Sequence, residues 1–310
     1  MTAREADLLA AFAAKVGTEG TVAAEGHRTR WEVGGPLVAG TRLVSAPSGI
    51  LSHTPEEMTV RLLAGTPVDE LHAELAARGQ RTGLPRRGGT VGGALAVGEN
   101  DVSVLGRGRV RDTLLQARYV TADGALVVAG APTVKNVSGF DLPRLLVGSL
   151  GTLGIFGEVV LRTQPIPASS CWIASTSADP FPVLDLVHRA SAVLWDGTRT
   201  FIELEGQSAD VEADRRALER VGEWSDVTTD ELPRLPPHRW SLSPAELCTL
   251  DREALGDWVA SIGVGTVWAT NPQLVGEVPG PLGALARRVK DGFDPTGRLA
   301  PGRSVWRRAA

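Results

Sequence analysis

Two glycine-rich stretches are the first candidates for chemistry in this 310-residue chain. One spans residues 88–93, and the other spans residues 135–154, where Gly148, Gly151 and Gly154 interrupt apolar sequence. Glycine weakens a helix or strand by roughly 0.5–1 kcal/mol relative to alanine, so a cluster of glycines needs a compensating reason. A left-handed turn or a close approach of the backbone to a ligand supplies one. The clusters therefore predict a large ligand lying against the backbone.

Polar side chains accompany these glycines. Thr90 can donate a hydroxyl hydrogen bond from the first cluster. In the second cluster, Lys135 either approaches an anionic group or remains solvated. Asn136 and Ser138 either hydrogen-bond a ligand or stabilise their own turn, as these residue types commonly do. Both alternatives remain open at the level of the sequence.

The elements that must position these loops form an α+β pattern in the first half of the chain. Residues 1–17 predict an amphipathic helix rather than a signal peptide. A strand at 58–63 leads into a helix for which Thr66 is the expected N-cap and Gly79 the end. The remaining expected elements are a hairpin of strands 114–119 and 125–129 turning at Asp123-Gly124, a short helix from Asp141 to Leu146, and a strand at 154–162.

A second lobe is expected after the prolines at 165 and 167. Its apolar pattern alternates between strand and helix, which predicts a small sheet covered by helices on one side. The expected strands are 171–175, 200–205 and 265–269, and the expected helices are 182–194, 209–221 and 253–262. A last helix is expected at 282–290.

Composition excludes several classes of function. The net charge is −4 with both signs mixed along the chain, so neither a nucleic-acid-binding arm nor a polybasic membrane patch is indicated. No run reaches the roughly 18 apolar residues of a membrane span. Cys171 and Cys248 are too few for a disulfide framework or a cysteine metal site, so we expect no metal and a cytoplasmic location. Small-molecule chemistry is the class that remains.

The glycine-rich landmarks, taken in order, resemble the vanillyl-alcohol oxidase and p-cresol methylhydroxylase (PCMH) type of FAD-binding fold. Within it they resemble the FAD-binding subunits of bacterial glycolate oxidases. The landmarks are the loop before Trp31, Gly89-Thr90-Val91-Gly92-Gly93, residues 108–112, residues 135–141, Gly151-Thr152-Leu153-Gly154-Ile155, and the terminal Phe293-Asp294-Pro295 and Pro301-Gly302. The resemblance implies a two-subdomain PCMH-type FAD-binding domain over 1–167, a small α/β cap over 168–280, and a segment over 281–310 that returns to the FAD domain.

The resemblance also implies which residues bind FAD. A loop whose N–H groups point inward binds phosphate without a charged side chain. The implied cofactor-binding residues are Gly26, His27, Arg28, Thr29, Thr90, Gly92, Gly93, Asp112, Lys135, Asn136, Ser138, Gly139, Gly151, Gly154 and Ile155.

The first of these loops departs from the pattern of the family. The family usually has three glycines before the threonine, whereas here His27 and Arg28 follow Gly26. Arg28 or Arg30 can offset phosphate charge directly, or remain solvated. Some relatives attach the flavin through a histidine of this loop, at a position that falls on Arg28 here, so we expect non-covalent FAD.

Residues for catalysis are harder to find. Catalytic relatives carry a histidine-rich and glycine-rich motif that this chain lacks. His188 is expected to be structural, inside a helix. The weak candidates are His238 and Arg239, where Arg239 either binds a substrate carboxylate or has a structural or interface role.

Three functions remain. The first is an FAD-binding subunit that takes part in oxidising a 2-hydroxy acid, glycolate or D-lactate, with a catalytic flavin subunit and an iron–sulfur subunit as partners. The second is a free-standing FAD-dependent 2-hydroxy-acid dehydrogenase, and the third is a cofactor-free assembly scaffold. The missing histidine motif favours the first. In that case any association with a membrane is peripheral, through the partners.

Overall fold

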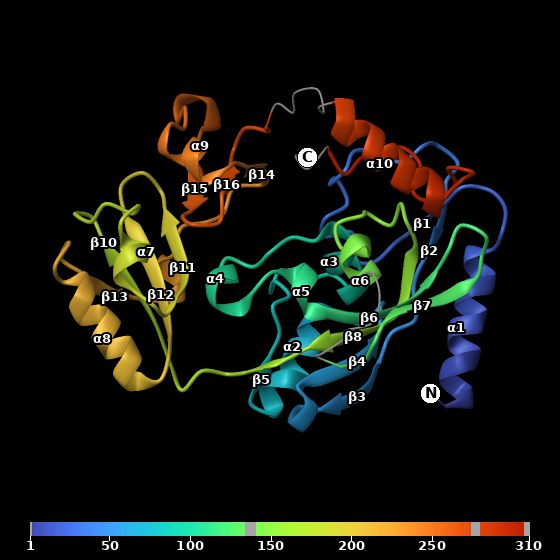
Figure 1. Ribbon diagram of the computed structural model, residues 1–310, viewed down its shortest axis with the longest axis horizontal. Helices are drawn as coiled ribbons and strands as arrows, with labels where there is room; N and C mark the ends of the chain where they lie inside the picture. Colours follow the sequence, from blue (N-terminus) through green and yellow to red (C-terminus); the bar gives the residue numbers. More distant parts are fainter. Residues whose placement is uncertain (1, 134–140, 274–279, 307–310) are drawn as a thin grey trace. The chain divides into compact units, whose positions relative to one another are not determined.

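The computed structural model describes residues 2–133, 141–273 and 280–306 (Figure 1). The chain divides into two compact units, each built from more than one segment. Unit 1 comprises Met1–Asp101, Arg109–Pro165 and Val275–Arg308. Unit 2 comprises Val102–Gly108, Ile166–Leu274 and the last two residues. Both units mix strands and helices, which confirms the expected mixture of α and β structure.

The centre of unit 1 is a five-stranded antiparallel sheet in the order β3-β4-β8-β6-β7 (Figure 1). The central strand β8 is buried at every position except its last, Arg162. The hairpin between β6 and β7 is confirmed, and its turn has Gly124 at φ +81°, which glycine adopts without strain. The strands are β3 Ile50–Thr54, β4 Thr59–Leu63, β6 Leu114–Val120, β7 Leu126–Gly130 and β8 Ile155–Arg162.

Short sheets and helices complete unit 1. Strand β1, Val22–Ala24, pairs in parallel with β2, Arg42–Val44, and β5, Gln80–Arg81, pairs with β9, Gln164–Pro165. The helices are α1 Ala3–Val16, α2 Val68–Ala77, α3 Val91–Val97, α5 Val110–Thr113, α6 Leu142–Leu146 and α10 Gly280–Phe293, with a 3₁₀ turn at Pro55–Glu57.

At the helix caps, the expectation for Asp141 is confirmed and the expectation for Thr66 is wrong. Thr2 and Glu5 form a capping box at the start of α1, and Asp141 accepts a hydrogen bond from the Arg144 N–H at the start of α6. Thr66 is not the N-cap of α2, because its hydroxyl donates to Leu63 O, at 2.7 Å, and accepts from Gly49 N–H. The N-cap is Pro67, so the helix begins one residue later than the capping pattern predicted.

The core of unit 1 lies between the five-stranded sheet and helices α2 and α3. Fully buried leucines from each element meet there, Leu62 and Leu161 from strands β4 and β8, and Leu71, Leu75 and Leu95 from the helices. Burying such a side chain contributes roughly 1.5–3 kcal/mol. This packing holds α3 against the central strand β8.

Unit 2 is a seven-stranded antiparallel sheet, in the order β13-β10-β12-β11-β15-β16-β14. Apolar clusters lie on both of its faces, one around Ile202 and Leu204 and one around Phe201 and Trp268. The strands are β10 Ser169–Ser175, β11 Ala190–Trp195, β12 Thr200–Gly206, β13 Ser225–Val227, β14 His238–Ser241, β15 Trp258–Ser261 and β16 Thr266–Ala269. The helices are α4 Val104–Arg107, α7 Val183–Leu186, α8 Ser208–Leu218 and α9 Pro244–Cys248, with 3₁₀ turns at Thr229–Glu231 and Glu253–Leu255.

Two helices predicted for this unit were wrong. The segment 182–194 contains only the short helix α7 before strand β11, and His188 therefore lies between them rather than inside a helix. The segment 253–262 is a 3₁₀ turn, ended by Gly256 at φ +69°, and then strand β15. Both misassigned strands lie inside the sheet, where pairing on each side outweighs local helix propensity.

Two properties of the described residues bear directly on function. No helix among them is long and apolar enough to cross a membrane. Within the same ranges no group of three or more histidine, cysteine, aspartate or glutamate side chains is arranged to hold a metal ion.

Candidate active site

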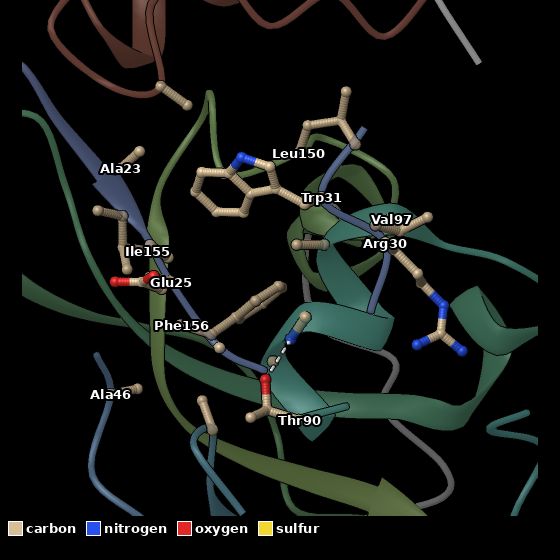
Figure 2. Close-up of a pocket in the computed structure, with 18 of the residues that line it drawn as sticks. Ala23, Glu25, Arg30, Trp31, Ala46, Thr90, Val97, Leu150, Ile155 and Phe156 are labelled. Atoms are coloured by element: carbon tan, nitrogen blue, oxygen red, sulfur yellow. Dashed lines mark hydrogen bonds between the residues drawn. The ribbon is translucent and has the colours of Figure 1, made fainter. Parts of the chain in front are cut away.

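One pocket lies wholly in unit 1 and encloses about 920 Å³ between its walls, part of it open to solvent (Figure 2). Four segments from distant parts of the sequence supply most of its lining: the loop after β1, α3, the turn before β8 with the start of that strand, and the C-terminal segment. Its lining includes Gly26, His27, Arg28, Thr29, Arg30, Trp31, Thr90, Gly92, Gly93, Leu150, Gly151, Gly154, Ile155, Phe156, Ala300 and Arg303. These segments bring together most of the glycines that the sequence singled out.

The loop after β1, residues 26–30, lines the pocket with a run of unpaired backbone donors. None of the five N–H groups from Gly26 to Arg30 has a hydrogen-bond partner among the residues that the structure describes. The N–H groups on either side, of Glu25 and Trp31, are paired with Val44 O and Arg28 O. Arg28 adopts φ +57°, a left-handed conformation that costs a non-glycine residue about 1 kcal/mol or more. Consecutive free N–H groups around a left-handed residue are typical of an anion-binding loop.

The start of α3 packs tightly against this loop. A Cβ atom at Gly26 would lie 2.5 Å from the Thr90 Oγ1 atom. Thr90 is the N-cap of α3, and its Oγ1 accepts a hydrogen bond from Gly93 N–H at 3.2 Å (Figure 2). Packing also favours glycine at position 92, since a Cβ there would lie 3.0 Å from Ala64 O. The glycines of 88–93 therefore serve close packing as well as access to the pocket.

The turn before β8 forms a second wall. Leu150 and Gly151 both have positive φ angles, at +56° and +74°, and the Leu150 side chain lies at the pocket (Figure 2). A Cβ at Gly154 would lie 2.4 Å from the Tyr119 ring, so this glycine is required by packing. Burial raises the pKa of the Tyr119 hydroxyl, which keeps it neutral. Ile155 and Phe156 continue the wall as an apolar surface.

Two of the three arginines that line the pocket are already paired with acids. The Arg28 Nε–H donates to Glu25 in the same loop. The Arg30 Nε–H donates to Glu99 at 2.8 Å, and both of these side chains are 9 % exposed. Arg87 donates to the other oxygen of Glu99. The two arginines that the sequence suggested as phosphate partners thus have carboxylate partners within the protein.

Trp31 and Arg303 line the pocket but were missed from the sequence as site residues. The indole of Trp31 lies in the pocket (Figure 2). The Arg28 guanidinium lies 4.8 Å and the Arg303 guanidinium 4.9 Å from the centre of its ring. Arg303 Nη1 donates to Val33 O at 2.7 Å. The signal that could have found Arg303 was its position directly after the Pro301-Gly302 landmark.

The structure brings together most of the residues expected to bind cofactor. Those that line the pocket are Gly26, His27, Arg28, Thr29, Thr90, Gly92, Gly93, Gly151, Gly154 and Ile155. Asp112 is not among the lining residues, and it forms an ion pair with Arg144 at 3.1 Å. Lys135, Asn136, Ser138 and Gly139 lie outside the described residues. The role of each in binding stays a prediction.

The catalytic candidates lie on one strand of unit 2. His238 and Arg239 begin β14, and Arg239 is opposite Trp268 of β16. His238 Nδ1 is buried and has no hydrogen-bond partner among the described residues. Neither residue lines the pocket of unit 1. Their proposed part in catalysis remains open.

The chemistry of the pocket suits an elongated ligand with two unlike parts. The N–H row of residues 26–30 can bind an anionic group. The wall of Leu150, Ile155 and Phe156, together with Trp31, can cover a flat apolar ring system. No acid that lines the pocket lacks a basic partner, because Glu25 is paired with Arg28.

Known proteins are similar to this chain in sequence or in fold. Residues 2–130 match the FAD binding domain family. Glycolate oxidase subunit GlcE of Escherichia coli (strain K12) is 28% identical over 325 aligned positions, which cover 90% of this chain and 91% of that protein. D-2-hydroxyglutarate dehydrogenase of Xanthomonas citri is 33% identical over 44% of this chain, but this match spans only 29% of that protein.

A solved structure shows the same fold. Alkyldihydroxyacetonephosphate synthase matches with a TM-score of 0.65 at 15% sequence identity, over 91% of this chain and 71% of that one. The FAD expected from the glycine-rich landmarks is confirmed as the cofactor of the matched domain. Residues 2–130 are therefore similar to the FAD binding domain family, and over most of its length the chain is similar to a subunit of an FAD-linked oxidoreductase.

Proposed function

We propose that this chain is the FAD-binding subunit of an oxidoreductase that oxidises a 2-hydroxy acid, glycolate or D-lactate, and passes the electrons to a partner. Its similarity to glycolate oxidase subunit GlcE extends over nearly the whole length of both chains, which supports a shared role. The single observation that carries the cofactor part is the row of unpartnered N–H groups from Gly26 to Arg30 in the pocket, counted among the described residues.

FAD fits the residues that are present. Its diphosphate needs hydrogen-bond donors, and the 26–30 loop offers backbone donors at a place where a Cβ on Gly26 would clash with Thr90. Its ring systems need apolar cover, which Ile155 and Phe156 provide. When bound, FAD supplies the acceptor for the hydride that leaves a 2-hydroxy acid. The residues of this chain would bind and orient the cofactor and keep water from part of its surface.

The finer fold assignment is part of the same proposal. We assign residues 1–167 to a PCMH-type FAD-binding domain, 168–280 to a small α/β cap, and 281–310 to a returning segment. The division of the chain supports this, because Ile166–Leu274 is a unit of its own and Val275–Arg308 belongs to unit 1. Unit 2 would then carry the surface for a substrate or a partner, with Arg239 as the candidate for binding a carboxylate.

The proposed partners are a catalytic flavin subunit and an iron–sulfur subunit. An iron–sulfur cluster is usually held by four cysteines, and this chain has two, Cys171 and Cys248. The relay must then lie in another chain. The histidine and glycine motif of catalytic relatives is also missing, which favours a role beside a catalytic subunit over free-standing activity.

The visible spectrum of the purified chain tests the proposal. After incubation with FAD and removal of excess, we expect a bound flavin spectrum that stays oxidised when glycolate or D-lactate is added. We expect it to be reduced only when the partner subunits are present. Bleaching of the flavin by substrate alone would instead support the free-standing dehydrogenase. A chain that binds no FAD under any condition would leave the cofactor-free scaffold as its function.

A further inference from the structure

Arg303 is the arginine of the pocket whose charge is not balanced by an acid. Arg28 is paired with Glu25 and Arg30 with Glu99. Arg303 has no carboxylate within ion-pair distance among the described residues, and its guanidinium donates instead to a neutral carbonyl, Val33 O. Among the arginines that line the pocket, Arg303 is thus the one without a carboxylate partner in the described part of the chain.

The position of Arg303 is fixed before any ligand binds. Its Nη1 donates to Val33 O at 2.7 Å, and its guanidinium lies 4.9 Å from the centre of the Trp31 ring. Ser304 N–H donates to Gly34 O, and Val38 N–H donates to Pro301 O, so the backbone on each side of Arg303 is tied to the segment after the N–H row. A donor held in this way loses little conformational entropy when it binds an anion.

The environment of Arg303 disfavours an isolated charge. Burial lowers the pKa of its guanidinium from the usual value, and Glu32 opposes this shift only in part. A partly buried cation without a partner costs free energy, which an anionic ligand beside it recovers. The arginine nevertheless remains charged at neutral pH.

We propose that Arg303 is the charged residue that binds the anionic part of the ligand, donating from its guanidinium to a diphosphate oxygen beside the N–H row of residues 26–30. This inference rests on the proposed FAD function and adds a residue from the far end of the chain to it. It also reassigns the charge contact that the sequence suggested for Arg28 or Arg30. Arg303 is a positioning residue for the cofactor and takes no part in proton transfer.

Calorimetric titration of the flavin-free full chain separates this contact from the rest of the site. The probes are FAD, ADP, which carries the diphosphate, and riboflavin, which carries neither phosphate nor adenine. We expect Arg303→Gln to weaken FAD and ADP binding by about tenfold to 100-fold, as the loss of a charge-assisted hydrogen bond does. Riboflavin binding should be unchanged. Arg287→Gln, at an exposed arginine of α10, is the matched control and should behave as the wild type.

A second variant keeps the test decisive if Arg303→Gln does not fold. Arg303→Lys keeps the charge, so its ADP binding should remain and should weaken with rising ionic strength, as for the wild type. FAD and ADP binding by a folded Arg303→Gln chain at wild-type strength would overturn the role of Arg303 alone. ADP binding that is insensitive to salt in both the wild type and Arg303→Lys would also overturn the role of Arg303. A wild type that binds neither FAD nor ADP would overturn the proposed function as well.

Discussion

At the scale of single residues, the site requires a position without a side chain, Gly26, as well as residues with strained backbone angles. Gly26 lies where a Cβ would meet Thr90 Oγ1 at 2.5 Å, so only glycine lets the loop pass the start of α3. Arg28 and Leu150 adopt left-handed conformations that are strained for their types. Such strain is usual where backbone groups must face a ligand, and both residues line the pocket.

Replacing Gly26 by alanine should therefore weaken FAD binding. The added Cβ pushes the loop away from Thr90 and displaces its N–H groups. This should cost about 1–3 kcal/mol of binding free energy, or about tenfold to 100-fold in affinity. Fluorescence titration with FAD measures the effect. The control is Gly292→Ala in α10, where a Cβ meets nothing within 4 Å and affinity should not change. Equal affinity of Gly26→Ala and the wild type would show that the loop does not hold the cofactor.

The attachment of the flavin is also decided by single residues. His27 is the histidine of the loop, and the attachment position of the relatives falls on Arg28, which cannot form the bond. Precipitating the FAD-loaded chain with acid should therefore leave the yellow colour in the supernatant. Flavin that stays with the precipitated protein, and is lost in His27→Ala, would show a covalent link and refute this prediction.

At the scale of elements, the C-terminal segment is tied to the N-terminal helix by one buried arginine. Arg298 is 5% exposed and donates to the carbonyl groups of Val16, Gly17, Glu19, Gly20 and Ala122. The carbonyl groups of Val16 and Gly17 lie at the end of α1, where helical carbonyls lack partners within the helix. The same segment carries Ala300 and Arg303 into the pocket.

Arg298→Ala should destabilise unit 1 strongly. It removes the donor of the buried Ala122 carbonyl and of the partly buried Gly17 and Gly20 carbonyls, at about 1–3 kcal/mol for each group that water does not reach, whereas Val16 O and Glu19 O also accept from Arg42. We expect a loss of at least about 3 kcal/mol in the free energy of unfolding, measured by urea denaturation. The exposed Arg287→Gln variant serves as the control. A loss below about 1 kcal/mol would mean that the carbonyls find other donors.

Asp294, in the same segment, should make stability depend on pH. It is 1% exposed, and although burial alone would raise its pKa, hydrogen bonds from Lys290 and from the N–H groups of Leu299 and Arg298 lower it overall. A lowered folded-state pKa gives stability that is complete above the unfolded-state value of roughly 3.9 and is lost as pH falls through the folded-state value.

Asp294→Asn should remove that part of the acid sensitivity. Urea midpoints at pH 6 and at pH 3 should fall less between the two conditions in the variant than in the wild type, and the variant should be the less stable of the two at pH 6. Asp291→Asn, at an exposed position of α10, should keep the wild-type slope. Identical slopes in Asp294→Asn and the wild type would contradict the prediction.

At the scale of the whole molecule, each unit has hydrophobic clusters of its own. In unit 1 they surround Leu62 and Leu95, and in unit 2 they surround Ile202 and Phe201. A ligand that binds only the native form of one unit stabilises that unit by about 2.7 kcal/mol at a concentration of 100 times its dissociation constant. FAD should therefore act on one unit and not on the other.

Differential scanning calorimetry should show two transitions, of which FAD raises only one. Phe201→Ala removes a fully buried ring from unit 2, at about 3–5 kcal/mol, and should lower only the transition that FAD does not move. A single transition that responds to both FAD and Phe201→Ala would show that the two units unfold together.

The sequence was sufficient for features that are local. The Asp141 cap of α6, the Asp123-Gly124 turn and the glycine loops each depend on residues a few positions apart, so their types and spacing were enough. The order of those loops along the chain also indicated an FAD-binding fold, and the family match confirms it.

Only the tertiary structure decided what depends on distant residues. Strands β11 and β15 were taken for helices, and they pair with each other, Leu194 opposite Ser261, although they lie far apart in the sequence. Arg30 pairs with Glu99, which lies 69 positions away, and Arg303 donates to Val33 O, which lies 270 positions away. No local pattern could therefore show which arginine of the pocket lacks a carboxylate partner. Turns and caps depend on residues that are close in the sequence. The electrostatic environment of a pocket depends instead on the charges of every segment that the fold brings close in space.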